Sequence, residues 1–129
     1  MRRNRLIFNR NLLLPLLLIS PVNFADWGDV YYCQETTSTS ISLYGDKKSY
    51  RPEKFKFRLS ESKRAMVFGL DGFFVGKVVK LRPEEYKPSL EEWYGYDEYG
   101  SYYFDEGYFV FASASHTGVY AISAVCEKF

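Results

Sequence analysis

The sequence predicts an all-β fold, a small single domain built as an antiparallel β-barrel or β-sandwich of seven to eight strands. The clearest observation is the alternation at residues 54–59, where Phe55, Phe57 and Leu59 are separated by basic residues. A period of two is typical of a strand with one buried and one solvated face. Further short β-rich runs follow at a spacing of roughly ten residues, which favours a sandwich or barrel over a layered α/β fold. A cysteine near each end of the predicted mature chain, residues 26–129, favours a closed topology.

Each strand candidate is a short run rich in β-branched or aromatic residues. Turn residues such as Gly, Asp and Ser separate most of these runs. In chain order the candidates are Val30–Glu35, Thr39–Tyr44, Glu53–Leu59, Ala65–Gly69, Phe73–Leu81, Ser101–Phe104, Gly107–Ala114 and Gly118–Cys126. No run of comparable clarity has the period of a helix.

The N-terminus has the pattern of a secretory signal peptide, predicted to span residues 1–25. It starts with four Arg among its first ten residues, continues with an apolar run from Leu12 to Ile19, and ends in a more polar stretch before Ala25. The apolar run is shorter than the about 20 residues that a membrane-spanning helix needs. We therefore expect cleavage after Ala25, no stable membrane span in the mature protein, and an exported, periplasmic or secreted protein with one domain at residues 26–129. An uncleaved N-terminal anchor is the alternative.

Removal of this segment changes the charge balance. The whole chain carries 17 basic and 16 acidic residues. Four of the Arg lie in the predicted signal, which leaves 13 basic against 16 acidic residues and a net charge of −3. A general nucleic-acid binder has the opposite balance, so nucleic acid is not an expected partner.

The two cysteines, Cys33 and Cys126, are predicted to form a disulfide. An even number of cysteines in an exported domain favours a bridge. A bridge requires Cα atoms within about 7 Å. The first and last strands are therefore expected to be neighbours, joined by this disulfide.

The stretch from Arg82 to Gly100 is the one long interruption between strand candidates. A single helical turn after Pro88 is expected near its start, because Ser89 suits the N-cap position and acidic residues follow it. Loops longer than about 12 residues in compact domains are usually functional or disordered. The many aromatic residues here argue against disorder, so this is where a functional site is expected.

An aromatic and acidic segment, residues 91–109, contains nine aromatic residues, six carboxylates and no Lys or Arg. One interpretation is a carbohydrate platform, in which rings stack on sugar faces and carboxylates accept hydrogen bonds from hydroxyls. A second is a protein-binding patch, because Tyr and Trp supply contact area with few rotamers to order. A third is that the rings belong to the core and its lid. The candidate binding residues are Trp93, Tyr94, Tyr96, Asp97, Glu98, Tyr99 and Tyr102.

Charge is segregated along the chain. Residues 47–64 carry eight basic side chains against two acidic ones, whereas residues 84–106 carry eight acidic side chains against Lys87 alone. The two stretches either face each other within the fold or give the surface two poles suited to a charged partner. The basic stretch is expected to be mainly a solvated strand face.

The sequence gives little support for catalysis, and no cofactor or metal is expected. A serine triad would depend on His116, the only histidine, but no nucleophile elbow accompanies it. Carboxylate pairs for glycoside hydrolysis exist in any acidic loop, and their separation is not readable from sequence. Residues 97–106 lack the acidic spacing of an EF-hand calcium loop. A small hydrolase is therefore the less favoured alternative.

The residues Tyr31-Tyr32-Cys33 match a Tyr-x-Cys strand, and Cys126 lies near the C-terminus. In these features, and in its size and export signal, the chain is faintly similar to small periplasmic β-barrel inhibitors of lysozyme. That resemblance implies a β-barrel and enzyme inhibition. The family's inhibitory loop starts with Ser-Gly and has a basic residue before a Tyr, whereas residues 117–120 read Thr-Gly-Val-Tyr. The main expectation remains an exported non-catalytic domain that binds a protein or a glycan, with an inhibitor as the alternative.

Overall fold

The computed structural model describes residues 25–82 and 92–129, which form nine strands and no helix. Every pair of neighbouring strands is antiparallel. The strands are β1 (Val30–Ser42), β2 (Lys47–Ser49), β3 (Lys54–Ser60), β4 (Ala65–Phe68), β5 (Val78–Lys80), β6 (Glu92–Asp97), β7 (Gly100–Asp105), β8 (Tyr108–Ser115) and β9 (Gly118–Lys128).

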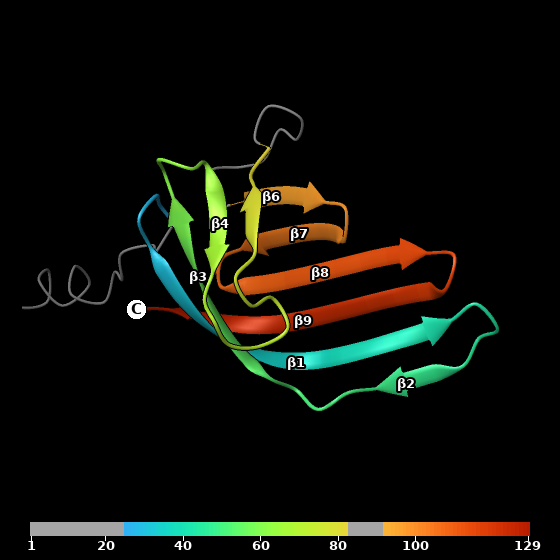
Figure 1. Cartoon of the computed structure of the whole chain (residues 1–129). Helices are drawn as coiled ribbons and strands as arrows, with labels where there is room; N and C mark the ends of the chain where they lie inside the picture. The colour runs from blue at the N-terminus through green and yellow to red at the C-terminus, as the bar shows by residue number, and fades with distance from the viewer. Residues whose placement is uncertain (1–24, 83–91) are drawn as a thin grey trace, which may run out of the picture.

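Eight of these strands form a nearly closed barrel in the order β5-β4-β3-β1-β9-β8-β7-β6 (Figure 1). An isolated bridge between Leu81 and Gly95 connects the two ends of this path. The backbone N–H of Arg82 donates to the carbonyl of Tyr94 at 2.8 Å beside it. The predicted all-β class is confirmed, and of the two predicted architectures the chain adopts the barrel.

The disulfide joins the first and last strands of the domain. Cys33 on β1 lies directly opposite Cys126 on β9, and their Cα atoms are 4.0 Å apart. The bond closes a sequence separation of 93 residues. The predicted bridge and the predicted contact between terminal strands are both confirmed.

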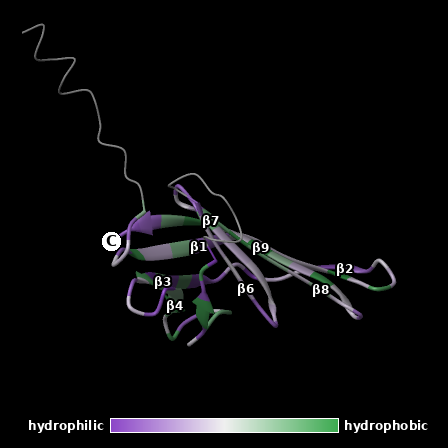
Figure 2. Cartoon of the chain, turned by 90° about the horizontal axis from the view of Figure 1, so that it is seen from above, coloured by the Kyte–Doolittle hydropathy of each residue, from purple (hydrophilic) through white to green (hydrophobic). Residues whose placement is uncertain are grey.

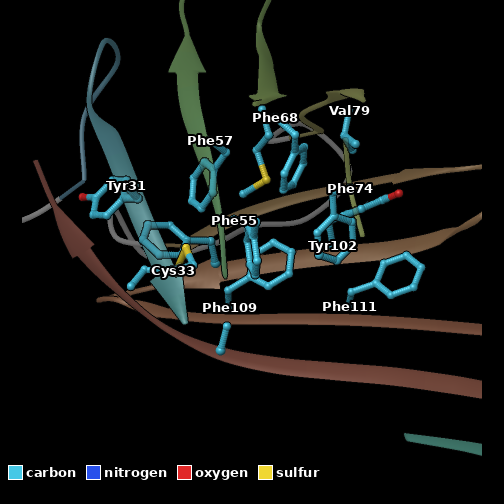
Figure 3. Packing of buried hydrophobic residues seen from close by; sticks show 14 of the residues in the cluster. Tyr31, Cys33, Phe55, Phe57, Phe68, Phe74, Val79, Tyr102, Phe109 and Phe111 are labelled. Carbon is cyan, nitrogen blue, oxygen red and sulfur yellow. A yellow bond between two sulfur atoms is a disulfide. The ribbon is translucent and has the colours of Figure 1, made fainter. Parts of the chain in front are cut away.

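The core consists largely of aromatic rings that point into the barrel from opposite walls (Figure 3). The alternation on β3 is confirmed, because Phe55, Phe57 and Leu59 are at most 3% exposed. Phe57 stacks on Tyr31 of β1 at 5.5 Å and meets Phe104 of β7 edge-on at 5.1 Å. Basic residues occupy the outer face of β3, as expected for a solvated strand face.

Several strand boundaries differ from those predicted. Residues 30–42 form one strand with a bulge between Glu35 and Thr37, and the extra residue moves the buried positions from Tyr31, Cys33 and Glu35 to Ser38. The predicted long strand before Leu81 is reduced to β5, and β2 was not predicted. The predicted loop from Arg82 to Gly100 is wrong, because its second half is β6. The predicted helical turn after Pro88 lies outside the described residues, as do residues 1–24 of the signal peptide predicted at residues 1–25.

The ends of β1, β8 and β9 extend beyond the barrel as a projecting sheet (Figures 1 and 2). This projection arises because β3 pairs only with the first part of β1, Val30–Gln34, while β2 pairs with Thr39–Ile41. The pair Lys47 and Lys48 lies on β2, the outermost strand of this extension, where exposed lysines discourage further strand pairing. The projecting sheet places the turns of two hairpins away from the core.

One carboxylate, that of Glu35, is buried on the inner side of the β1 bulge. Its Oε1 accepts a hydrogen bond from the backbone N–H of Glu53 at 3.1 Å, whereas its buried Oε2 has no partner in the described part of the chain. Burial raises the pKa of this carboxyl above its ordinary value of 4.5, and the charge of Glu53 adds to the rise. The backbone hydrogen bond opposes the shift.

The substitution Glu35→Gln is expected to stabilise the protein at pH 7. The raised pKa means that folding disfavours the ionised carboxylate, so Glu35 lowers stability once pH rises above its unfolded pKa. The amide keeps an oxygen for the Glu53 N–H and cannot ionise. Urea denaturation should show the gain at pH 7 and its loss at pH 3. An equal difference at both pH values would contradict the assigned cause.

Candidate functional site

The candidate site is built on the β6–β7 hairpin, whose turn is held by Asp97. The carboxylate Oδ1 of Asp97 accepts hydrogen bonds from the backbone N–H groups of Tyr99 at 2.9 Å and Gly100 at 3.1 Å. This side-chain arrangement stabilises tight turns that begin with Asp. A side chain at Gly100 would collide with the carbonyl oxygen of Ala112 on β8, so glycine allows the hairpin to lie close to its neighbour.

The β alternation divides the predicted binding residues between two faces. Trp93 on β6 and Tyr102 on β7 lie on the inward face, whereas Tyr94 and Tyr96 lie on the outward face. The rings of Tyr94 and Tyr96 are 6.1 Å apart. The structure therefore does not bring all seven predicted residues together on one surface.

Tyr102 is part of the core, so the expectation that its ring stacks on a ligand is wrong. The residue is fully buried and packs against Phe111 at 4.9 Å. Its hydroxyl donates to Oδ2 of Asp97 at 3.1 Å. Burial, followed by the charge of Asp97, raises the pKa of the Tyr102 hydroxyl. Both carboxylate oxygens of Asp97 are thus occupied within the hairpin, and its role is to position the turn.

Trp93 is half-buried and packs against the core rather than standing on the surface. Its ring meets Trp27 edge-on at 4.9 Å, and the guanidinium of Arg64 lies 5.2 Å from the Trp27 ring. The indole Nε1 is buried and has no hydrogen-bond partner among the residues described. Trp93 therefore closes one side of the barrel.

Two cations near β5 pack on tyrosines of the hairpin. The Nζ of Lys77 lies 3.5 Å from the ring centroid of Tyr99, and the guanidinium of Arg82 lies 4.4 Å from that of Tyr96. Such cation–π contacts fix the orientation of partly exposed rings. The aromatic segment contains no cation of its own, and barrel closure supplies these two from another part of the chain.

An open pocket of about 490 Å³ lies at the hairpin turn. Four predicted binding residues line it: Tyr96, Asp97, Glu98 and Tyr99. Tyr99 is 58% exposed, and Glu98 is exposed beside it. The opposite wall comes from β8 and β9, and the complete lining is Tyr96, Asp97, Glu98, Tyr99, Gly100, Ser101, Ala112, Ser113, Ala114 and Val119. We refer to this as the outer pocket.

A smaller pocket of about 250 Å³ lies at the β8–β9 hairpin and is lined mainly by hydroxyl groups. Ser113 and Ser115 of β8 contribute from the inward-facing positions, opposite Tyr120 and Gly118 of β9. The full lining is Ser40, Ile41, Ser42, Ser113, Ser115, Thr117, Gly118, Val119 and Tyr120. We refer to this as the inner pocket, because successive residues of β8 point to opposite faces.

The β8 residues of both pockets were not predicted as site residues. Ser113 and Ala114 belong to a predicted strand, but their exposure results from a difference in strand length. The paired part of β7 ends at Ser101, opposite Ala112, whereas β8 continues to Ser115. No local sequence signal marks this step in the sheet.

The structure offers little support for the alternative serine triad. His116 lies in the exposed β8–β9 turn. The hydroxyl of Ser115 pairs with that of Thr117 at 2.7 Å, and in residues 25–82 and 92–129 no hydrogen bond links it to His116. Within the same residues, no group of three or more His, Cys, Asp or Glu side chains is placed to hold a metal ion.

Comparison with known proteins found no matching family model, and no similar curated protein or solved structure. No helix in the described part of the chain has the length and apolar character needed to cross a membrane. The disulfide is compatible with an extracellular or otherwise oxidising compartment.

Proposed function

We propose that this protein is an exported, non-catalytic binding domain that recognises a protein or a glycan through the outer pocket. The observation that carries the proposal is the convergence of Tyr96, Glu98 and Tyr99 on one open pocket of about 490 Å³. Its volume lies within the roughly 300–1,000 Å³ range of small-ligand sites. Exposed tyrosine rings suit the apolar face of a sugar or an apolar side chain.

The contacts around the pocket support binding more than catalysis. General acid–base hydrolysis of a glycan needs two carboxyl groups that are available to the substrate. Asp97 uses both oxygens to hold the hairpin and Tyr102. Lys77 holds the ring of Tyr99 in place before a ligand arrives, which reduces the entropy cost of binding.

A screen against a glycan array and a displayed random peptide library tests the proposal. We expect Tyr99→Ala to weaken the best ligand by at least tenfold, because the ring forms much of the exposed wall of the pocket. The matched control is Tyr108→Ala, which removes a ring that is 65% exposed but does not line the pocket. Equal affinity of the native protein and Tyr99→Ala would contradict the proposal.

Enzyme inhibition is the second candidate, and the projecting sheet favours it. The β1–β2 turn carries Leu43 and Tyr44, which are 66% and 88% exposed. A protruding turn with apolar side chains is suited to enter a cleft in a partner enzyme. In that case, Tyr44→Ala would abolish binding and Tyr99→Ala would not.

A further inference from the structure

The edge of β8 beside the outer pocket offers unpaired backbone groups. The β8–β9 hairpin has a two-residue turn, so its closing pair, Ser115 and Gly118, is a hydrogen-bonded pair. Antiparallel pairing alternates along a strand, so Ser113 and Ser115 bond to β9 while Ala112 and Ala114 direct their N–H and C=O groups toward β7. Ala112 is paired with Ser101.

Ala114 lacks a partner on the β7 side. Continuation of the register would place Tyr99 opposite Ala114, but Tyr99 belongs to the turn held by Asp97. No backbone hydrogen bond outside the strand ladders reaches Ala114 from the described residues. The backbone N–H and C=O of Ala114 are therefore exposed and can pair with a strand that occupies the position an extended β7 would take.

Two pockets adjoin this edge. The outer pocket is lined by Ala112, Ser113 and Ala114, and the inner pocket by Ser113 and Ser115. Strand addition to a sheet edge has this geometry: main-chain hydrogen bonds supply affinity, and pockets for alternate side chains supply specificity. A glycan has no alternating N–H and C=O groups to match the edge.

We propose that an extended segment of a partner protein adds to β8 as an antiparallel strand at Ser113–Ser115. This proposal rests on the proposed function and specifies its ligand. The partner residue opposite Ala114 forms two backbone hydrogen bonds and directs a large apolar side chain into the outer pocket. Its two neighbours direct small polar side chains toward the inner pocket.

The negative charge at the β6–β7 turn indicates which type of residue follows the added partner strand at its C-terminal end. In the antiparallel direction the C-terminal end of the added strand reaches the hairpin turn, where the exposed carboxylate of Glu98 lies. The Asp97 carboxylate is already occupied, so Glu98 is the acidic group of the turn that faces this end. A basic residue after the alternating stretch complements it.

The experiment starts with selection of a random octapeptide library on the purified protein. Enriched peptides are expected to have an apolar residue between small polar residues, followed by Lys or Arg. Their dissociation constants would then be measured by fluorescence anisotropy. Ala114→Pro is expected to weaken binding at least tenfold, because proline removes the N–H at the edge without removing a hydrogen bond to β9.

The control Ala114→Ser keeps the N–H and should bind within threefold of the native protein. A selected peptide that is N-methylated at the residue opposite Ala114 should also lose at least tenfold, and this arm requires no folded variant. Strand addition would be overturned if the selection enriched no peptide, or if the N-methylated peptide bound with the same affinity as the unmethylated one. Glycan binding that is sensitive to Tyr99→Ala but not to Ala114→Pro would also overturn it, while leaving the proposed function intact.

Discussion

Replacing both Cys33 and Cys126 by alanine is expected to lower the free energy of unfolding by about 4 to 5 kcal/mol, the largest effect of any change considered. The bond closes 93 residues, and a cross-link over so long a loop removes much of the conformational freedom of the unfolded chain. The figure is an upper value, because residual structure in the unfolded chain reduces it. This loss is comparable with the net stability of a small domain.

Urea denaturation of the native protein and of the double alanine variant would measure this loss. Reduction of the native protein under the same conditions serves as the control, because it breaks the bond without changing the side chains. A loss below about 1 kcal/mol would show that the β1–β9 ladder alone holds the terminal strands together. Mass spectrometry of the unreduced protein should also show no free thiol.

Phe57→Ala is expected to cost about 3 to 5 kcal/mol, the range for removal of a buried aromatic ring. Phe57 is 1% exposed and contacts rings from three other strands: Tyr31, Phe68 and Phe104. The substitution would leave a cavity at the centre of the barrel. Side chains from both halves of the sheet pack around this position, so they can relax only slightly to fill the cavity.

Lys54→Ala is the matched control for Phe57→Ala, because it lies on the outer face of the same strand. It should change stability by less than about 0.5 kcal/mol. Chemical denaturation of both variants would measure the contrast. Similar losses at the two positions would contradict the assignment of inward and outward faces on β3.

The fold class was predictable because its signals are local or covalent. The alternation at Phe55, Phe57 and Leu59 assigns one strand and its buried face without reference to any neighbour. The two cysteines require the chain ends to meet. The choice between barrel and sandwich was not predictable, because it depends on whether the two ends of the sheet meet, as they do at the bridge between Leu81 and Gly95 and the hydrogen bond from Arg82 to Tyr94.

β6 escaped prediction because both of its faces carry aromatic residues. Trp93 points inward while Tyr94 and Tyr96 point outward, so hydropathy does not alternate along the strand. Gly95 is a weak strand former. It is buried beneath the carbonyl of Lys80, where a side chain would collide, and the requirement for glycine there comes from barrel closure.

The candidate site was predictable only in part. The sequence located the segment, but only the paired register separates Tyr102 in the core from Tyr99 at the exposed turn. The partners of the tyrosines, Lys77 and Arg82, are brought to them by barrel closure. The exposed edge at Ala114 depends on the relative lengths of β7 and β8, which no single segment encodes.

Ligands are expected to bind at the β6–β7 turn, and amide chemical-shift mapping tests this expectation most directly. The uniformly ¹⁵N-labelled protein would be titrated with the highest-affinity peptide or glycan from the screen. We expect the largest shifts at residues 97–101 and 112–115, with residues 54–58 on the outer face of β3 unchanged. Shifts confined to residues 54–58, or to the β1–β2 turn at Leu43 and Tyr44, would contradict the claim.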